Sequence, residues 1–210
     1  MRVKTEARRQ AILDTAAQVF REEGFERASM SAICERLGYS KATLYNYFQS
    51  KEELFSTVVF EATEAEWRAT HEALDSSVEN ISQALALFGR RFLTILYSPD
   101  VQAMRRLMAS EAGRSGLGKQ YYDRGTARSQ TDIADFLQRA MDAGKLRQGN
   151  AWFAALHLVG LLESEWSPCF LFQTLETISA EAIHATVERA VGAFLGAYGP
   201  HALDALDGNP

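Results

Sequence analysis

Apolar residues recur at helical spacing along most of the chain. In the first segment they fall at Ile12, Leu13, Ala16 and Phe20, and similar intervals continue to about Tyr198. Such spacing is typical of amphipathic helices, whereas half-buried strands alternate apolar and polar positions. No segment reads as a strand, so the sequence predicts an all-α fold.

Capping residues and glycines mark where the helices begin and end. Gly24 and Gly144 follow helical segments, Asn150 and Ser179 precede them, and a Ser-Pro pair at Pro168 interrupts the chain. The helices expected from these signals run over residues 6–23, 29–37, 40–48, 51–74, 80–97, 99–112, 120–143, 150–166 and 179–198.

The stretch from Ser29 to Phe48 reads as two short helices joined by a tight turn. Ser29 and Ser40 are good N-terminal caps, and Gly38 can adopt the positive φ that often follows a helix. In the second helix Leu44 and Phe48 lie four apart and point inward, so the remaining positions stay available to a partner. The pattern indicates a helix-turn-helix, although helical hairpins with a glycine turn also occur in ordinary bundles.

The particular residues of this stretch carry a resemblance to a known family. The run from Gly38 to Phe48, followed by SKEELF at residues 50–55, closely resembles the signature of the TetR/AcrR family of transcriptional regulators. Residues 91–112, RFLTILYSPDVQAMRRLMASEA, resemble more loosely the ligand-binding domain of an AefR-like subset.

The resemblance implies a division of the chain into two domains. An N-terminal three-helix bundle with the helix-turn-helix is expected over residues 1–50, and a C-terminal helical domain for effector binding and dimerisation over residues 51–199. Residues 200–210 are expected to form a frayed tail.

The charge of the chain does not by itself point to nucleic acid. The net charge is −5 and the pI is near 5.5. Residues 1–55 carry nine Lys and Arg against eight Asp and Glu, which leaves 13 against 19 in the remainder. The expectation of DNA binding therefore rests on the motif and not on charge.

Cysteine and histidine usage bears on location and chemistry. Cys34 and Cys169 are far apart with no CxxC, which favours reduced thiols in the cytoplasm. Cys34 is expected as a small buried filler, with a redox sensor as the alternative. No apolar run approaches the roughly 18 residues of a membrane span. The four histidines are scattered, so neither a metal, a cofactor nor an enzyme is expected; His157 suits a core or interface position better than a ligand role.

A recognition helix places its first turns in the major groove and reads base edges with polar side chains. Lys41 and Thr43 lie at the entering end of the second helix. Asn46 offers the amide best suited to a base edge, with adenine as the favoured partner. Ser29 can present its hydroxyl and a backbone amide to a phosphate.

Further contacts are implied by the resemblance. Tyr45 and Tyr47 belong to the part that meets the groove wall, and Tyr47 and Lys51 contact phosphates. For Tyr45, packing inside the N-terminal domain is equally open. The expected DNA-binding residues are Ser29, Lys41, Ala42, Thr43, Tyr45, Asn46, Tyr47 and Lys51.

Two C-terminal segments suggest a homodimer. Residues 151–165 are apolar nearly all round, and the last helix carries an apolar stripe with Gly192 and Gly196 beside it. Together with the resemblance, this favours a four-helix bundle completed by a second copy, with a self-contained core as the alternative. The expected interface residues are Trp152, Leu156, Val159, Ile183, Val187, Ala190, Val191 and Phe194.

Large, adaptable side chains are frequent in the C-terminal part. Most such residues are core, but the resemblance implies a small-molecule cavity, and a largely apolar effector is expected there. The expected lining residues are Trp67, Phe88, Phe92, Leu96, Met104, Met108, Tyr121, Phe136, Trp166 and Phe170, with Phe172 on the same inner surface.

These expectations combine into one function. The chain is expected to be a homodimeric transcriptional regulator on a roughly palindromic double-stranded DNA operator, most simply a repressor released by a small, largely apolar effector. The alternative is a helical adaptor or small-molecule-binding protein that keeps the hairpin for packing and does not bind DNA.

Overall fold

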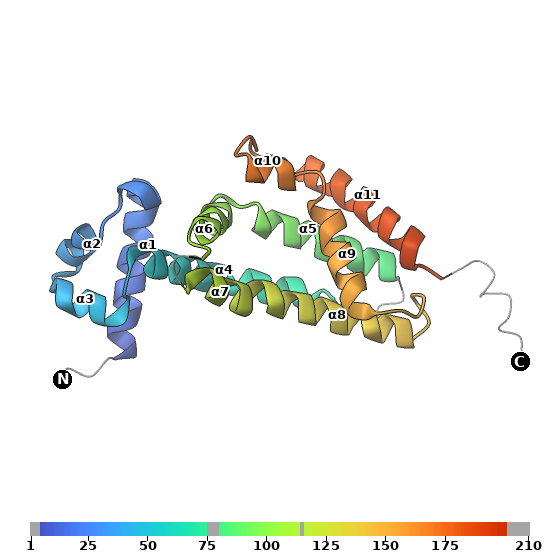
Figure 1. The fold of residues 1–210 in the computed structure, drawn as a ribbon, viewed down its shortest axis with the longest axis horizontal. Helices are drawn as coiled ribbons and strands as arrows, with labels where there is room; N and C mark the ends of the chain where they lie inside the picture. Colours follow the sequence, from blue (N-terminus) through green and yellow to red (C-terminus); the bar gives the residue numbers. More distant parts are fainter. Residues whose placement is uncertain (1–4, 75–79, 114–115, 201–210) are drawn as a thin grey trace, which may run out of the picture. The chain divides into compact units, whose positions relative to one another are not determined.

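The structure is a computed structural model that describes residues 5–74, 80–113 and 116–200. Every regular element within those ranges is helical, which confirms the all-α prediction (Figure 1). The elements are α1 (Glu6–Arg27), α2 (Met30–Leu37), α3 (Lys41–Tyr47), α4 (Lys51–Glu72), α5 (Ile81–Leu96), α6 (Pro99–Ser110), α7 (Leu117–Tyr121), the π-helical turn η1 (Tyr122–Thr126), α8 (Ala127–Asp142), α9 (Ala151–Glu163), α10 (Ser167–Leu171) and α11 (Ala180–Tyr198).

The chain forms two compact units. The head unit comprises the chain up to Ala65 together with Ala103–Tyr121, and the body unit comprises Glu66–Gln102 and the chain from Tyr122 onward. Two helices, α4 and α6, therefore pass from one unit into the other. The expected domain border at residue 50 coincides with the start of α4 and stays a prediction. Of the expected tail at residues 200–210, residues 201–210 lie outside the described residues.

The head unit is built around the apolar side of α1. Ile12, Ala16 and Val19 are fully buried, and Phe20 meets Phe55 of α4 edge to face with ring centroids 5.0 Å apart. Gly24 has φ 75°, and after it the chain adds one further turn to reach Arg27. The glycine thus kinks this helix at the predicted end instead of terminating it.

In the body unit, α11 packs against α5 and α9, and α9 also packs against α8. Gly89 of α5 permits the close approach, because a Cβ there would lie 2.9 Å from Leu162 and 3.0 Å from Val187. Fully buried side chains fill the space between these helices: Leu85, Phe88, Leu93, Ile133, Phe136, Leu137, Met141 and Phe194.

Two segments differ from the sequence prediction. The helix expected from residue 120 begins at Leu117 and passes through the π-helical turn η1 before α8. The Ser-Pro pair begins the short helix α10, since proline fits the first turn of a helix, where its missing N–H costs nothing.

A further property of the helices concerns membranes. Among the described residues, no helix combines the length and the apolar character needed to span a bilayer.

Candidate functional site

The helix-turn-helix forms with the predicted caps. Ser29 Oγ accepts a hydrogen bond from Ala32 N at 3.1 Å, and Ser40 Oγ accepts one from Thr43 N at 3.2 Å. Gly38 ends α2 in the left-handed conformation, with φ 67°. Local sequence signals therefore determine where α2 ends and α3 begins.

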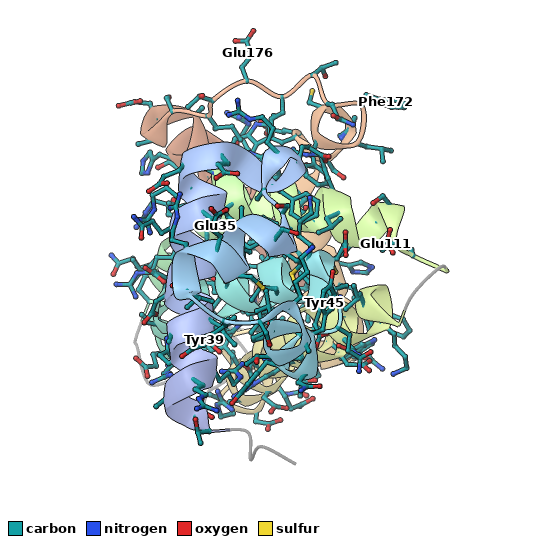
Figure 2. All side chains as sticks on the ribbon, turned by 90° about the vertical axis from the view of Figure 1, so that its left-hand side faces the viewer. Glu35, Tyr39, Tyr45, Glu111, Phe172 and Glu176 are labelled. Atoms are coloured by element: carbon teal, nitrogen blue, oxygen red, sulfur yellow. The ribbon has the colours of Figure 1, made fainter. Side chains whose placement is uncertain are left out.

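One side of α3 faces solvent, and the other side is buried in the head unit. Leu44 is fully buried and Phe48, which follows the helix, is 3% exposed, as predicted. Tyr45 is 48% exposed (labelled in Figure 2), and Lys41, Ala42 and Asn46 are also exposed. These four positions share one face because they are one, three, four or five residues apart on the helix.

Two other expected contact residues are half-buried and have partners within the head unit. Thr43 Oγ1 lies 2.9 Å from Ser40 Oγ, at the N-terminus of α3. Tyr47 Oη accepts a hydrogen bond from Thr5 N at 2.9 Å and so ties the end of α3 to the start of α1. Sequence spacing could not reveal the hydrogen bond between Thr5 and Tyr47, because 42 residues separate them.

Lys51 has partners in the last turn of α1 and in the connection from α1 to α2. Its Nζ donates to the carbonyl of Phe25 at 2.8 Å and to that of Ala28 at 3.1 Å. It also lies 4.2 Å from the centre of the Phe25 ring, within the range of a cation–π contact. A phosphate contact by Lys51 would compete with these interactions.

An ion pair and a buried thiol complete the head unit. Arg36 Nη1 lies 2.6 Å from Glu22 Oε2, so α2 is joined to α1, and this hydrogen bond lowers the pKa of the Glu22 carboxyl. Cys34 is 5% exposed, and burial raises the pKa of its thiol, although Lys41 opposes the shift. The burial of Cys34 favours the filler role over the redox sensor.

Three residues expected to line the effector cavity form an aromatic cluster in the body unit. Trp67 meets Phe92 edge to face at 5.7 Å, and Phe88 lies 5.3 Å from Phe92. His71, which was not among the expected lining residues, joins them: Nδ1 donates to the Trp67 carbonyl at 2.8 Å, and Nε2 lies 2.9 Å from Ser129 Oγ. The cluster thus combines aromatic rings with a polar pair.

The other expected lining residues fall into different surroundings. In the body unit Trp166 contacts Tyr97 at 5.2 Å, and Phe170 lies 6.4 Å from the same ring. The remaining members are buried or packed within their own units: Leu96 and Phe136 in the body unit, and Met104, Met108 and Tyr121, which contacts Phe60, in the head unit.

The expected interface residues divide into two groups. Trp152 is 40% exposed, and Leu156, Val159 and Ile183 are half-buried, so these four remain available to a second copy. The other four are at most 5% exposed within the single chain, because the apolar stripe of α11 packs on α5 and α9: Val187, Ala190, Val191 and Phe194. For these four the structure differs from the expectation.

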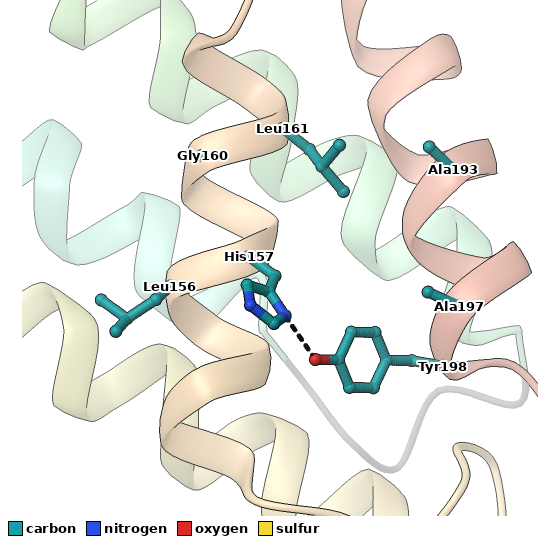
Figure 3. A pocket seen from close by; sticks show the side chains of 7 residues that line it. All are labelled: Leu156, His157, Gly160, Leu161, Ala193, Ala197 and Tyr198. Atoms are coloured by element: carbon teal, nitrogen blue, oxygen red, sulfur yellow. Dashed lines mark hydrogen bonds between the residues drawn. The ribbon is translucent and has the colours of Figure 1, made fainter.

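The outward side of α9 and α11 carries a hollow with a volume of about 440 Å³ (Figure 3). His157, at its edge, is hydrogen-bonded to Tyr198 Oη at 2.5 Å. The lining is mostly apolar or small: Leu156, His157, Gly160, Leu161, Ala193, Ala197 and Tyr198. We call this surface, with the exposed Trp152 and Phe153, the α9–α11 face.

Large apolar side chains are exposed near this face. Phe153 is 56% exposed, Leu171 69% and Phe172 74%. The expected position of Phe172 on an inner surface is wrong, because the turn after α10 carries the ring into solvent (Figure 2). Across the described ranges, no three His, Cys, Asp or Glu side chains are grouped so as to hold a metal ion.

Comparison with known proteins identifies both parts of the chain. A family described as "AefR-like transcriptional repressor, C-terminal domain" matches residues 83–200, and one described as "Bacterial regulatory proteins, tetR family" matches residues 12–58. The HTH-type transcriptional regulator UidR of Escherichia coli (strain K12) is 35% identical over 117 residues. That match covers 50% of this chain and 60% of UidR, less than two thirds of the relative.

Solved structures match over nearly the whole length. A protein from Mesorhizobium loti MAFF303099, described as a TetR-family transcriptional regulator, has a TM-score of 0.79 at 27% identity and covers 93% of this chain and 100% of its own. FrrA, named as a flavonoid-responsive regulator, has a TM-score of 0.69 at 31% identity, with 94% and 100% covered. The chain belongs to the TetR family of transcriptional regulators, which are not enzymes, and carries that family's helix-turn-helix DNA-binding domain.

Proposed function

We propose that the chain is a dimeric cytoplasmic repressor that occupies a roughly palindromic operator and is released by a small, largely apolar effector. The observation that carries the proposal is the solvent-facing side of α3, where Lys41, Ala42, Tyr45 and Asn46 are exposed together. The description of the matching C-terminal family as an AefR-like repressor supports repression over activation.

Each exposed group has a role that follows from its chemistry. Asn46 reads a base edge, Lys41 adds charge at the groove, and the exposure of Tyr45 favours contact with the groove wall over packing. Ser29 Oγ accepts from Ala32 N, so its own hydrogen stays available for a phosphate oxygen. Tyr47 and Thr43 add contacts from the border of the same face.

A single head offers too few base contacts for specificity. Each good bidentate pair is worth only about 1–3 kcal/mol of discrimination, so two heads are required. The α9–α11 face supplies an apolar surface on which a second copy can pack through a twofold axis. Trp152, Phe153, Leu156, Val159 and Ile183 would form this contact, and the small side chains of α11 would allow the helices to approach closely.

The effector is proposed to bind against the aromatic cluster of Trp67, Phe88 and Phe92, with His71 and Ser129 supplying polar contacts. The name of FrrA as flavonoid-responsive, at 31% identity, supports a planar aromatic molecule. Trp67 lies on α4, the helix that begins at Lys51 directly after the helix-turn-helix. A molecule that displaces Trp67 therefore acts on a helix shared with the head unit.

Fluorescence anisotropy with duplexes from upstream of the chain's own gene tests DNA binding. Binding is expected to be sequence-specific and to persist in excess nonspecific DNA, whereas an adaptor would give no specific signal. Asn46→Ala should change the preference among operator variants, while Gln138→Ala, an exposed change on α8, should not. If Asn46→Ala binds every variant like the parent, Asn46 does not read the operator.

Effector action is tested with flavonoids and related planar aromatics. A 100-fold loss of DNA affinity requires the effector to prefer the non-binding state by about 2.7 kcal/mol. The effective molecule should raise the melting temperature and lower operator affinity, and Trp67→Ala should remove both effects. A ligand that raises the melting temperature without changing operator affinity would contradict this part of the proposal.

A further inference from the structure

The segment between α9 and α11 turns back just after α10. Leu171 and Phe172 lie at this turn, and we call these two apolar residues the tip. The tip is held in place by backbone hydrogen bonds: Phe172 N donates to the Pro168 carbonyl at 3.0 Å, and Thr174 N donates to that of Cys169 at 2.9 Å. Gln173 reverses the chain with φ 55°. Two large apolar side chains are therefore presented to solvent by an ordered turn, which is unusual unless a partner covers them.

The start of the same segment is fastened to α11. Glu165 accepts hydrogen bonds from Arg189 at 2.8 and 2.7 Å and from Thr186 Oγ1 at 2.8 Å. At the opposite end, His157 of α9 bonds to Tyr198 of α11. These links show that α9 and α11 run antiparallel, so the tip lies beyond one end of the pair and the Tyr198 side of the hollow lies toward the other.

Two copies related by a twofold axis can pack with opposite ends of this pair together. In an isologous contact the same patch of each copy is used, and a twofold axis that lies in the plane of the contact and runs across the helices lays each end of the α9–α11 pair on the opposite end of the partner's pair. The tip of one copy then meets the hollow of the other. The hollow is open to solvent, and its mostly apolar lining matches Leu171 and Phe172.

We propose that the tip of each copy docks into the hollow of its partner, where Phe172 packs beside Ala193, Ala197 and Tyr198. This inference rests on the proposed dimer through the α9–α11 face and names the contact that makes it specific. It explains why one chain carries both an exposed aromatic tip and an apolar hollow. The occupant of the hollow is thus a second copy of this chain.

Disulfide trapping between two different variants tests the contact directly. Both carry Cys169→Ser, while the buried Cys34 is retained; one adds Phe172→Cys and the other Ala197→Cys or Ala193→Cys. A disulfide requires Cα atoms within about 7 Å, so oxidising the mixture should give a covalent dimer at one of the two hollow positions. Neither variant should cross-link alone, and Gln138→Cys on α8 should not cross-link with Phe172→Cys. Cross-linking of Phe172→Cys with itself, or none in the mixture, would overturn the inference.

Sedimentation equilibrium separates this inference from the proposed dimer. Phe172→Ser should weaken dimerisation by about 100-fold, because each dimer loses two docked rings and each buried Phe contributes at least roughly tenfold. Leu87→Ser, which removes another exposed apolar side chain, should leave the dimer constant unchanged. A parent that stays monomeric would refute the dimer itself. A dimeric parent with an equally dimeric Phe172→Ser would refute only the tip contact and assign the tip to another partner.

Discussion

Lys51 shows how a single side chain can have a structural role at a position expected to bind DNA. The resemblance implied a phosphate contact, yet its ammonium group donates to carbonyls in the last turn of α1 and in the α1–α2 connection and lies on the Phe25 ring. Lys41, by contrast, is exposed on α3. The two lysines are therefore a matched pair in which structural and DNA-binding roles can be separated.

Replacing each lysine by Met should have different effects. Lys51→Met should lower the free energy of unfolding by about 1–3 kcal/mol, because buried or half-buried carbonyls lose a charged donor. Lys41→Met should change stability by less than about 0.5 kcal/mol but reduce the salt dependence of DNA binding by about one phosphate contact. Urea denaturation and anisotropy at several salt concentrations measure the two effects. If Lys51→Met keeps the stability of the parent but reduces the salt dependence of DNA binding, Lys51 contacts a DNA phosphate after all.

Helix ends were the elements most predictable from sequence, because caps act locally. Ser29, Ser40, Asn80, Asn150 and Ser179 each accept a hydrogen bond from the backbone at the start of the helix that follows. The solvent-facing positions of α3 were predictable for the same reason, since the buried Leu44 and Phe48 define the opposite side.

The surfaces that pack against each helix face were less predictable than the helix ends. Periodicity shows that one side of α11 is buried but not which surface covers it. Val187 and Phe194, which the stripe predicts at the contact with a second copy, are covered by their own chain. The exposed tip at Phe172 was missed because an aromatic residue in an apolar sequence reads as core. The link between His71 and Ser129 joins residues 58 apart and has no local signal.

The attachment of the α9–α10 segment to α11 should depend on pH. The hydrogen bond from Arg189, and after it that from Thr186, lowers the pKa of Glu165 below its usual 4.5. A carboxylate with a lowered pKa stabilises the fold above its unfolded pKa, and the contribution is lost as the pH falls through the folded value. Acidification below pH 4.5 should therefore loosen this attachment.

Thermal melts of Glu165→Gln between pH 7 and about pH 3.5 test whether the attachment of the α9–α10 segment to α11 depends on pH. The variant should be less stable than the parent at pH 7, by less than about 1 kcal/mol because the pair is partly exposed, and the difference should vanish at acid pH. Glu176→Gln, which removes an exposed carboxylate from the same segment, is the control. A difference that grows on acidification would be inconsistent with the lowered pKa.

At the scale of the whole molecule, charge is unevenly distributed between the two ends of the sequence. The chain is acidic overall, and all of the acidic excess lies after residue 55. Acidic surface repels DNA, so only the near-neutral N-terminal part is suited to approach it. Affinity must then come from a small set of contacts on α3, repeated in two copies of the chain.

The stoichiometry of the DNA complex tests this claim most directly. Sedimentation velocity of the chain with an operator duplex, found by footprinting upstream of its gene, should show two chains bound per duplex. Phe153→Asp, which places a charge on the α9–α11 face, should yield monomers and lose specific binding at the same concentration. A specific complex containing one chain, or a Phe153→Asp monomer with parental operator affinity, would contradict the account.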